Sequence, residues 1–224
     1  MGRAEILARI EKSGLPGRVK GYCSGVIKSG SGSSLKAALK ADAGKTIENI
    51  EGLLSAGGEI LGHSKEEVLF TTGFNTNNKA PERFEAALAE LRAAEFLRRE
   101  GFSCLKLIGA GAKKSADLFG VRDGLKYVFE VCCVRGRGGL AAAPAVRLEA
   151  KLDAKFVQVN GSRKEYGCER RGVVFVTDPY GLSAPASAGE LKKLAGELHA
   201  GKSGARSVHV CLISGGSAAV FPEW

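Results

Sequence analysis

A hairpin signature in the middle of the chain constrains the fold more than any other feature of the sequence. Two runs rich in apolar and aromatic residues, 115–121 and 126–134, stand on either side of an Asp123-Gly124 pair. An Asp-Gly pair between two such runs is typical of the tight turn that joins antiparallel strands. The sequence therefore predicts a β-hairpin, and with it a β-sheet.

The segments around this hairpin alternate between helical and strand patterns. Before it, Phe84, Leu88 and Leu91 are spaced as on one face of a helix, and Gly101 is a suitable residue to end that helix. Further strands are expected over 103–109, 172–178 and 207–214, and further helices over 146–160 and 189–201. The order αβββαβαβ predicts an α/β fold in which helices flank a central mixed sheet.

The beginning of the chain has a different character. Residues 12–40 include six basic residues and no acidic one, interleaved with glycine and serine, so this stretch is expected to be loop-rich or loosely packed and to bury little. A short helix is expected over 46–54, and Ser64 with Glu67 has the spacing of a capping box.

A connector rich in asparagine and glycine leads into Pro81, which stands where a helix can begin. We therefore place a domain boundary near residue 79. It divides the chain into a small, basic, mostly helical N-terminal region (1–78) and an α/β core (79–224).

Charge and cysteine content narrow the classes of function. The 224 residues carry a formal net charge of +9, with a pI of about 9.3, which favours an anionic partner, nucleic acid ahead of a membrane surface. The six cysteines form no Cys-x-x-Cys pair, so neither a zinc site nor a disulfide framework is expected. Without a signal-like start or an apolar run of membrane length, a cytoplasmic location is expected.

Two carboxylates of the hairpin have no obvious structural purpose. Strand alternation places Glu130 on one face with Val128, Cys132 and Val134, so an ionised carboxylate there needs a proton, a hydrogen bond or a cation. Asp117 lies on the preceding strand, near enough to share one ion with it. Two such oxygen ligands suit Mg²⁺ or Mn²⁺, which lowers the pKa of bound water and stabilises charge on a cleaved phosphodiester.

With these residues in place, the chain resembles the PD-(D/E)XK superfamily of restriction-endonuclease-like nucleases. Glu90, in the first helix, lies eleven residues before the Gly101-Phe102 pair that opens the first strand; an Asp on the second strand and a third strand with an acid follow. The resemblance covers roughly residues 82–214. It implies a restriction-endonuclease-like core and Mg²⁺-dependent (or Mn²⁺-dependent) cleavage of DNA in repair, recombination or restriction.

The resemblance also implies roles for individual residues. Asp117 and Glu130 would hold the metal with the carbonyl of Val131, Glu90 would bind it through water, and Gln158 would lie beside the site. Glu95 is the second choice for the helix carboxylate. The family has Lys where this chain has Cys132, so either another cation positions the attacking water or the site is inactive. The candidates for this cation are Lys114, Lys151, Lys155 and Arg135.

Nucleic-acid contacts are expected from a basic segment that flanks this site. Its candidate members are Arg135, Arg137, Lys151, Lys155, Arg163 and Lys164. By analogy to the fold, a homodimer would suit the cutting of two DNA strands.

Two other functions remain open. One is a catalytically inactive nuclease fold that binds nucleic acid or a protein partner, in which Glu130 pairs with a Lys or Arg and Asp117 bonds local amides. The other is a nucleotide or S-adenosylmethionine site, because Gly109 and Gly111 follow a strand and Glu130 lies twenty-one residues after Gly109. That site requires parallel strands with a crossover helix.

Overall fold

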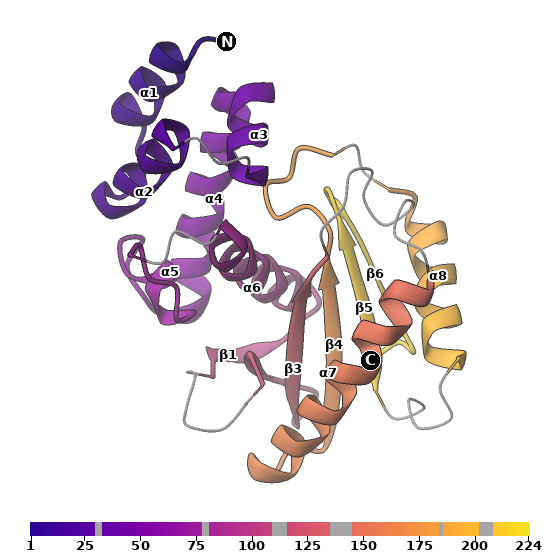
Figure 1. Ribbon diagram of the computed structural model, residues 1–224. Helices are drawn as coiled ribbons and strands as arrows, with labels where there is room; N and C mark the ends of the chain where they lie inside the picture. The colour runs from indigo at the N-terminus through magenta and orange to yellow at the C-terminus, as the bar shows by residue number, and fades with distance from the viewer. Residues whose placement is uncertain (30–32, 78–80, 109–115, 135–144, 184–185, 202–207) are drawn as a thin grey trace.

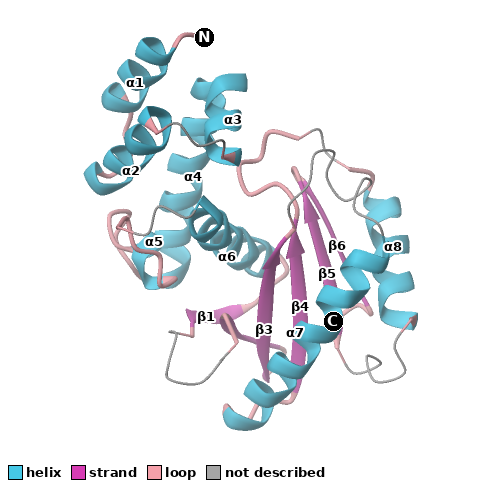
Figure 2. Ribbon diagram, in the orientation of Figure 1, coloured by secondary structure: helices cyan, strands magenta, loops and turns pink. Residues whose placement is uncertain are grey.

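The computed structural model describes residues 1–29, 33–77, 81–108, 116–134, 145–183, 186–201 and 208–224. The described chain forms an α/β fold in which a mixed sheet is flanked by helices (Figures 1 and 2). A cluster of further helices lies at the N-terminal end.

The sheet contains six strands whose spatial order follows their order in the chain. The strands are β1 (Ser103–Leu107), β2 (Leu118–Arg122), β3 (Leu125–Cys133), β4 (Arg170–Val176), β5 (His209–Ser214) and β6 (Ser217–Phe221). The central pairs β3–β4 and β4–β5 are parallel, and the other three pairs are antiparallel. The predicted turn joins β2 to β3, and Asp123 and Gly124 have φ of 51° and 77°, the left-handed geometry that such a turn requires.

Helices cover both faces of the sheet. One face carries α6 (Pro81–Arg99), whose Ala93 and Phe96 pack with Phe129 and Val174 of the central strands. The other face carries α7 (Ala145–Glu165) and α8 (Ala188–Ala200). These helices pack on the alternate side chains of the same strands, such as Val128 of β3 and Val173 of β4. The central strands are therefore covered on both sides, as the apolar run of β4 predicts.

The described part of the N-terminal region contains five helices. They are α1 (Arg3–Lys12), α2 (Gly17–Lys28), α3 (Ser34–Ala41), α4 (Ala43–Leu61) and α5 (Val68–Thr71). Their shared core also takes in Phe84 and Leu88 of α6 and Tyr180 from the loop after β4, so packing is continuous across residue 79. The division into two domains at that position stays a prediction.

Three local expectations need correction. The stretch 12–40 buries much more than expected, because Val19, Cys23 and Ile27 recur at helical spacing and form an apolar side of α2. The helix expected over 46–54 extends over all of α4. Ser64 does not cap α5 through a capping box: its hydroxyl donates to the Glu67 carboxylate, while the backbone N–H of Glu67 donates to the Ser64 carbonyl.

The last strand, β6, was not expected from the sequence. A Gly215-Gly216 pair joins it to β5, and Gly215 has a φ of 58°. Gly-Gly between two apolar runs is itself a hairpin signal, which the alanine-rich run after it obscured. Among the described helices, none is long and apolar enough to cross a membrane.

Candidate metal and catalytic site

Glu130 lies in the middle of the sheet, where its side chain is completely buried. As alternation predicts, it faces α7 together with Val128 and Cys132. Its Oε2 accepts a hydrogen bond from Lys155 Nζ at 2.7 Å. The other oxygen, Oε1, is buried and receives no hydrogen bond from any donor of the described residues. One oxygen of this carboxyl group therefore has a cationic donor, and the other has no donor among the described residues.

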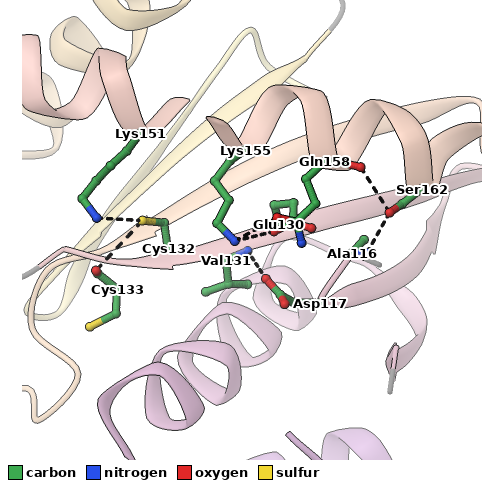
Figure 3. A network of polar contacts seen from close by, with 10 residues as sticks. All are labelled: Ala116, Asp117, Glu130, Val131, Cys132, Cys133, Lys151, Lys155, Gln158 and Ser162. Carbon is green, nitrogen blue, oxygen red and sulfur yellow. Dashed lines mark hydrogen bonds and ion pairs between the residues drawn. The ribbon is translucent and has the colours of Figure 1, made fainter. Parts of the chain in front are cut away.

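The periodicity of α7 explains why a lysine reaches this carboxylate. Leu148, Leu152 and Val159 form the apolar stripe that packs on the sheet. Lys155 falls three residues after Leu152 and four before Val159, so it projects from the same stripe. Figure 3 shows its side chain pointing from α7 to Glu130.

Asp117 stands where the pairing of β2 with β3 ends. Its backbone N–H donates to the Phe129 carbonyl at 2.9 Å, and its side-chain Oδ2 accepts from the Val131 N–H at 2.7 Å. The Val131 N–H of β3 therefore donates to the Asp117 carboxylate, where a backbone carbonyl of β2 would accept in a regular sheet. The carbonyl of Val131 points to the same side as its N–H, because both groups of one residue lie on one edge of a strand.

Asp117 immediately precedes β2 and Glu130 lies on the neighbouring β3, and the carboxyl group of each affects the pKa of the other. Burial, and then the negative charge of Asp117, raise the pKa of Glu130 to about 8, although Lys155 opposes the shift. Burial also raises the pKa of Asp117, although the hydrogen bond from the Val131 N–H and the charge of Lys155 act to lower it. A buried carboxylate beside a second, half-buried one is favoured when a proton or a cation offsets their like charges.

Glu90 of α6 lies near enough to Asp117 and Glu130 for their charges to act on it. Burial, and then the charge of Asp117, raise the pKa of Glu90 well above its usual value, and Lys155 and Glu130 also act on it. Glu95 interacts with the Arg92 guanidinium. The structure thus brings the first choice for the helix carboxylate to the site. Among the described residues, no three acids, histidines or cysteines converge closely enough to form a complete metal cage by themselves.

The cations expected near Cys132 have different positions. Lys155 bonds to Glu130 and also approaches Gln158 Oε1 at 3.5 Å, whereas Lys151 Nζ lies 3.7 Å from the Cys132 sulfur. Burial alone would lower the pKa of Lys155, but the bond to Glu130 outweighs it and the pKa is raised. Lys114 and Arg135 lie outside the described residues.

The remaining basic candidates are dispersed. Arg163 is half-buried at the end of α7, and Lys164 beside it is exposed. The pKa of Arg171 is lowered, first by its own burial and then by the positive charge of Arg163. Arg137 lies outside the described residues. The sequence analysis missed Ser162, whose hydroxyl contacts the backbone beside Asp117 (Figure 3). The only signal for it is a serine seven residues after Lys155, on the apolar stripe of α7.

The nucleotide or S-adenosylmethionine alternative loses its structural premise. Gly109 and Gly111 lie outside the described residues, but the strands on either side of them, β1 and β2, pair antiparallel. A dinucleotide-type site requires parallel strands joined by a crossover helix.

The comparisons with known proteins do not identify a relative. The chain matches no protein-family model, and the searches of curated proteins and of solved structures return no match.

Proposed function

We propose that this chain is a metal-dependent endonuclease with a restriction-endonuclease-like core of the PD-(D/E)XK type, which hydrolyses DNA phosphodiester bonds with Mg²⁺ or Mn²⁺. One observation carries the proposal: the completely buried Glu130 bonds to Lys155, keeps one oxygen without a hydrogen bond from the described residues, and feels the charge of Asp117 at the start of the neighbouring strand. The order of the elements supports the same family. Helix α6 precedes the antiparallel strands β1, β2 and β3, and α7 then leads to β4, which is parallel to β3.

The residues present fit a divalent cation. Asp117, Glu130 and the carbonyl of Val131 would supply hard oxygen ligands, and Glu90 would accept hydrogen bonds from bound water. Mg²⁺ keeps several waters, so an incomplete set of protein ligands suits it. The bound ion would supply Lewis acidity and a water of lowered pKa.

Lys155 takes the role that Cys132 cannot fill. A neutral thiol neither holds nor polarises a nucleophilic water, whereas the Lys155 ammonium is a donor beside both carboxylates. Gln158, whose Oε1 lies 3.5 Å from the ammonium, orients it. Lys151 and Lys164 on α7 are proposed to contact phosphates of the substrate, with Arg163.

A second candidate function is a non-catalytic nuclease fold that binds nucleic acid or a protein partner. The Lys155–Glu130 ion pair and Cys132 favour it, because a buried pair of this kind can serve stability or specificity alone.

Cleavage of supercoiled plasmid by the full chain, with Mg²⁺, Mn²⁺ or EDTA, separates the two functions. An endonuclease cuts only with the ion, and Asp117→Ala and Glu130→Ala abolish cutting while DNA binding, measured by fluorescence anisotropy, is retained. Glu90→Gln reduces cutting, whereas the matched variant Glu95→Gln, on the same helix, retains it. Binding without cutting by the unmodified protein under either ion contradicts the endonuclease and supports the second candidate.

A further inference from the structure

Ser162 is a buried hydroxyl on the side of α7 that otherwise packs apolar groups against the sheet. It is 1% exposed and follows Leu148, Leu152, Lys155 and Val159 on one stripe. A small apolar residue would fill this position without any polar group to satisfy. The presence of a hydroxyl therefore needs an explanation.

The two hydrogen bonds of this hydroxyl supply one. Ser162 Oγ accepts from the backbone N–H of Ala116 at 2.7 Å and donates to the Gln158 carbonyl at 3.3 Å (Figure 3). Ala116 is itself 1% exposed, so its N–H has no access to water. The hydroxyl links the backbone of α7 to the segment that enters β2.

The link is adjacent to the metal-binding carboxylate. The Ala116 N–H is held by Ser162, and the next N–H along the chain, that of Asp117, is held by the Phe129 carbonyl of β3. Two consecutive peptide groups are thus tied to different elements, one to the helix and one to the strand. These two bonds restrict the backbone at Asp117 and so favour the side-chain position in which its carboxylate accepts from the Val131 N–H.

The same helix also supplies Lys155 and Gln158 to the site. Lys155, Gln158 and Ser162 are separated by three and four residues, so they stand on one side of α7 at successive turns. Any shift of α7 along the sheet would move the ammonium and the Ser162 anchor together.

We propose that Ser162 is a positioning residue, which sets the place of Asp117 relative to Glu130 and Lys155 and so defines the geometry of the metal ligands. The metal-binding part of this inference rests on the proposed function. Ser162 touches neither substrate nor metal: it acts through the Ala116 peptide.

The first test needs no metal. Amide hydrogen exchange of Val131 is measured by NMR in the wild type, Ser162→Ala and Ser162→Thr. Thr46→Val is the matched control, because Thr46 is also a completely buried helical hydroxyl that donates to the carbonyl four residues earlier, in α4. Ser162→Ala is expected to speed Val131 exchange about tenfold, because it leaves the buried Ala116 N–H without its acceptor and loosens the segment that carries Asp117. Ser162→Thr keeps the hydroxyl and restores protection. Equal Val131 exchange in Ser162→Ala and Thr46→Val overturns the inference.

The second test measures Mn²⁺ binding by calorimetry and the kinetics of plasmid cleavage. Ser162→Ala is expected to weaken Mn²⁺ binding about tenfold to 100-fold and to lower kcat with little change in KM for DNA. Thr46→Val leaves both unchanged. Equal Mn²⁺ affinity in the wild type and Ser162→Ala overturns the inference. A wild type that binds no Mn²⁺, with Val131 exchange still accelerated in Ser162→Ala, upholds the positioning role and removes the nuclease proposal instead.

Discussion

The described contacts of two buried glutamates of this protein differ. Glu85 of α6 is 3% exposed, and neutral donors meet its Oε1: the Ser34 hydroxyl of α3 and the Tyr180 hydroxyl, at 3.4 Å. Glu130 is also buried, but it faces the like charge of Asp117 and the ammonium of Lys155. The contrast shows that burial of an acid does not by itself mark a reactive site. Glu130 is proposed as catalytic because a second acid acts on it and one of its oxygens accepts no hydrogen bond from the described residues.

The surroundings of Glu85 have a structural purpose. Close to it, Asn49 of α4 donates to the Tyr180 carbonyl at 2.9 Å, and Arg92 of α6 donates to the Pro179 carbonyl at 2.7 Å. These bonds tie the N-terminal helices and α6 to the loop that leaves β4. Glu85 belongs to this attachment, whereas Glu130 belongs to the proposed catalytic site.

Cleavage should separate the two glutamates most clearly. Glu130→Gln removes an anionic ligand and is expected to lower kcat by at least about 100-fold, since even outer-shell partners of a metal contribute up to that much. Glu85→Gln is expected to retain the wild-type rate per folded molecule, measured on plasmid with Mn²⁺. A comparable loss in both variants would show that the contrast between them is structural only.

The pH dependence of stability should report Glu130 next. Its folded pKa of about 8 lies above the ordinary value of 4.5, so over this interval the folded state holds a proton that the unfolded chain releases. Stability therefore falls as the pH rises from about 4.5 to 8, by on the order of a few kcal/mol without metal. Urea unfolding at several pH values checks this. Glu130→Gln should flatten the decline, and Thr46→Val, which removes no titrating group, should keep it.

A divalent ion should reverse that loss. At a Mn²⁺ concentration of 100 times its Kd, the ion is expected to stabilise the wild type by about 2.7 kcal/mol, because it binds only the folded chain. Thermal unfolding with and without Mn²⁺ measures the effect. The stabilisation should persist in Glu85→Gln and disappear in Asp117→Asn. If it persists in Asp117→Asn, the ion binds elsewhere.

The smallest effect is expected at the attachment site. Tyr180→Phe removes one hydroxyl donor to Glu85 and should lower the free energy of unfolding by about 1 kcal/mol. Neither Mn²⁺ affinity nor the cleavage rate should change. A loss of Mn²⁺ affinity in this variant would mean that the two regions are coupled.

Sequence reasoning was most successful where the pattern is local. The Asp123-Gly124 turn, the alternation of β3 and the helix that ends at Gly101 all depend on neighbours in the chain, and the structure confirms them. It failed in the stretch 12–40, where net charge and glycine content concealed an apolar side at helical spacing. A compositional average gives no information about which side of a helix each residue occupies.

In the candidate site too, the residues that a local pattern brings together could be predicted, and those that depend on tertiary packing could not. Asp117 and Glu130 could be selected in advance, because a hairpin turn determines which residues of two strands lie close together. Among four candidate cations, sequence alone could not select Lys155, because α7 returns to the sheet only after the long segment that follows β3. Ser162 carried no signal that distinguishes it from an ordinary serine.

By itself, the sequence determined the hairpin, the succession of helices and strands, and the face of β3 on which Glu130 lies. These follow from backbone preferences and side-chain periodicity over a few residues. Only the tertiary structure decided that Lys155 donates to one oxygen of Glu130, that the charges of Asp117 and Glu130 act on Glu90, and that Ser162 holds the Ala116 peptide. Such contacts depend on how α6 and α7 are placed on the sheet, which is set by the packing of whole elements.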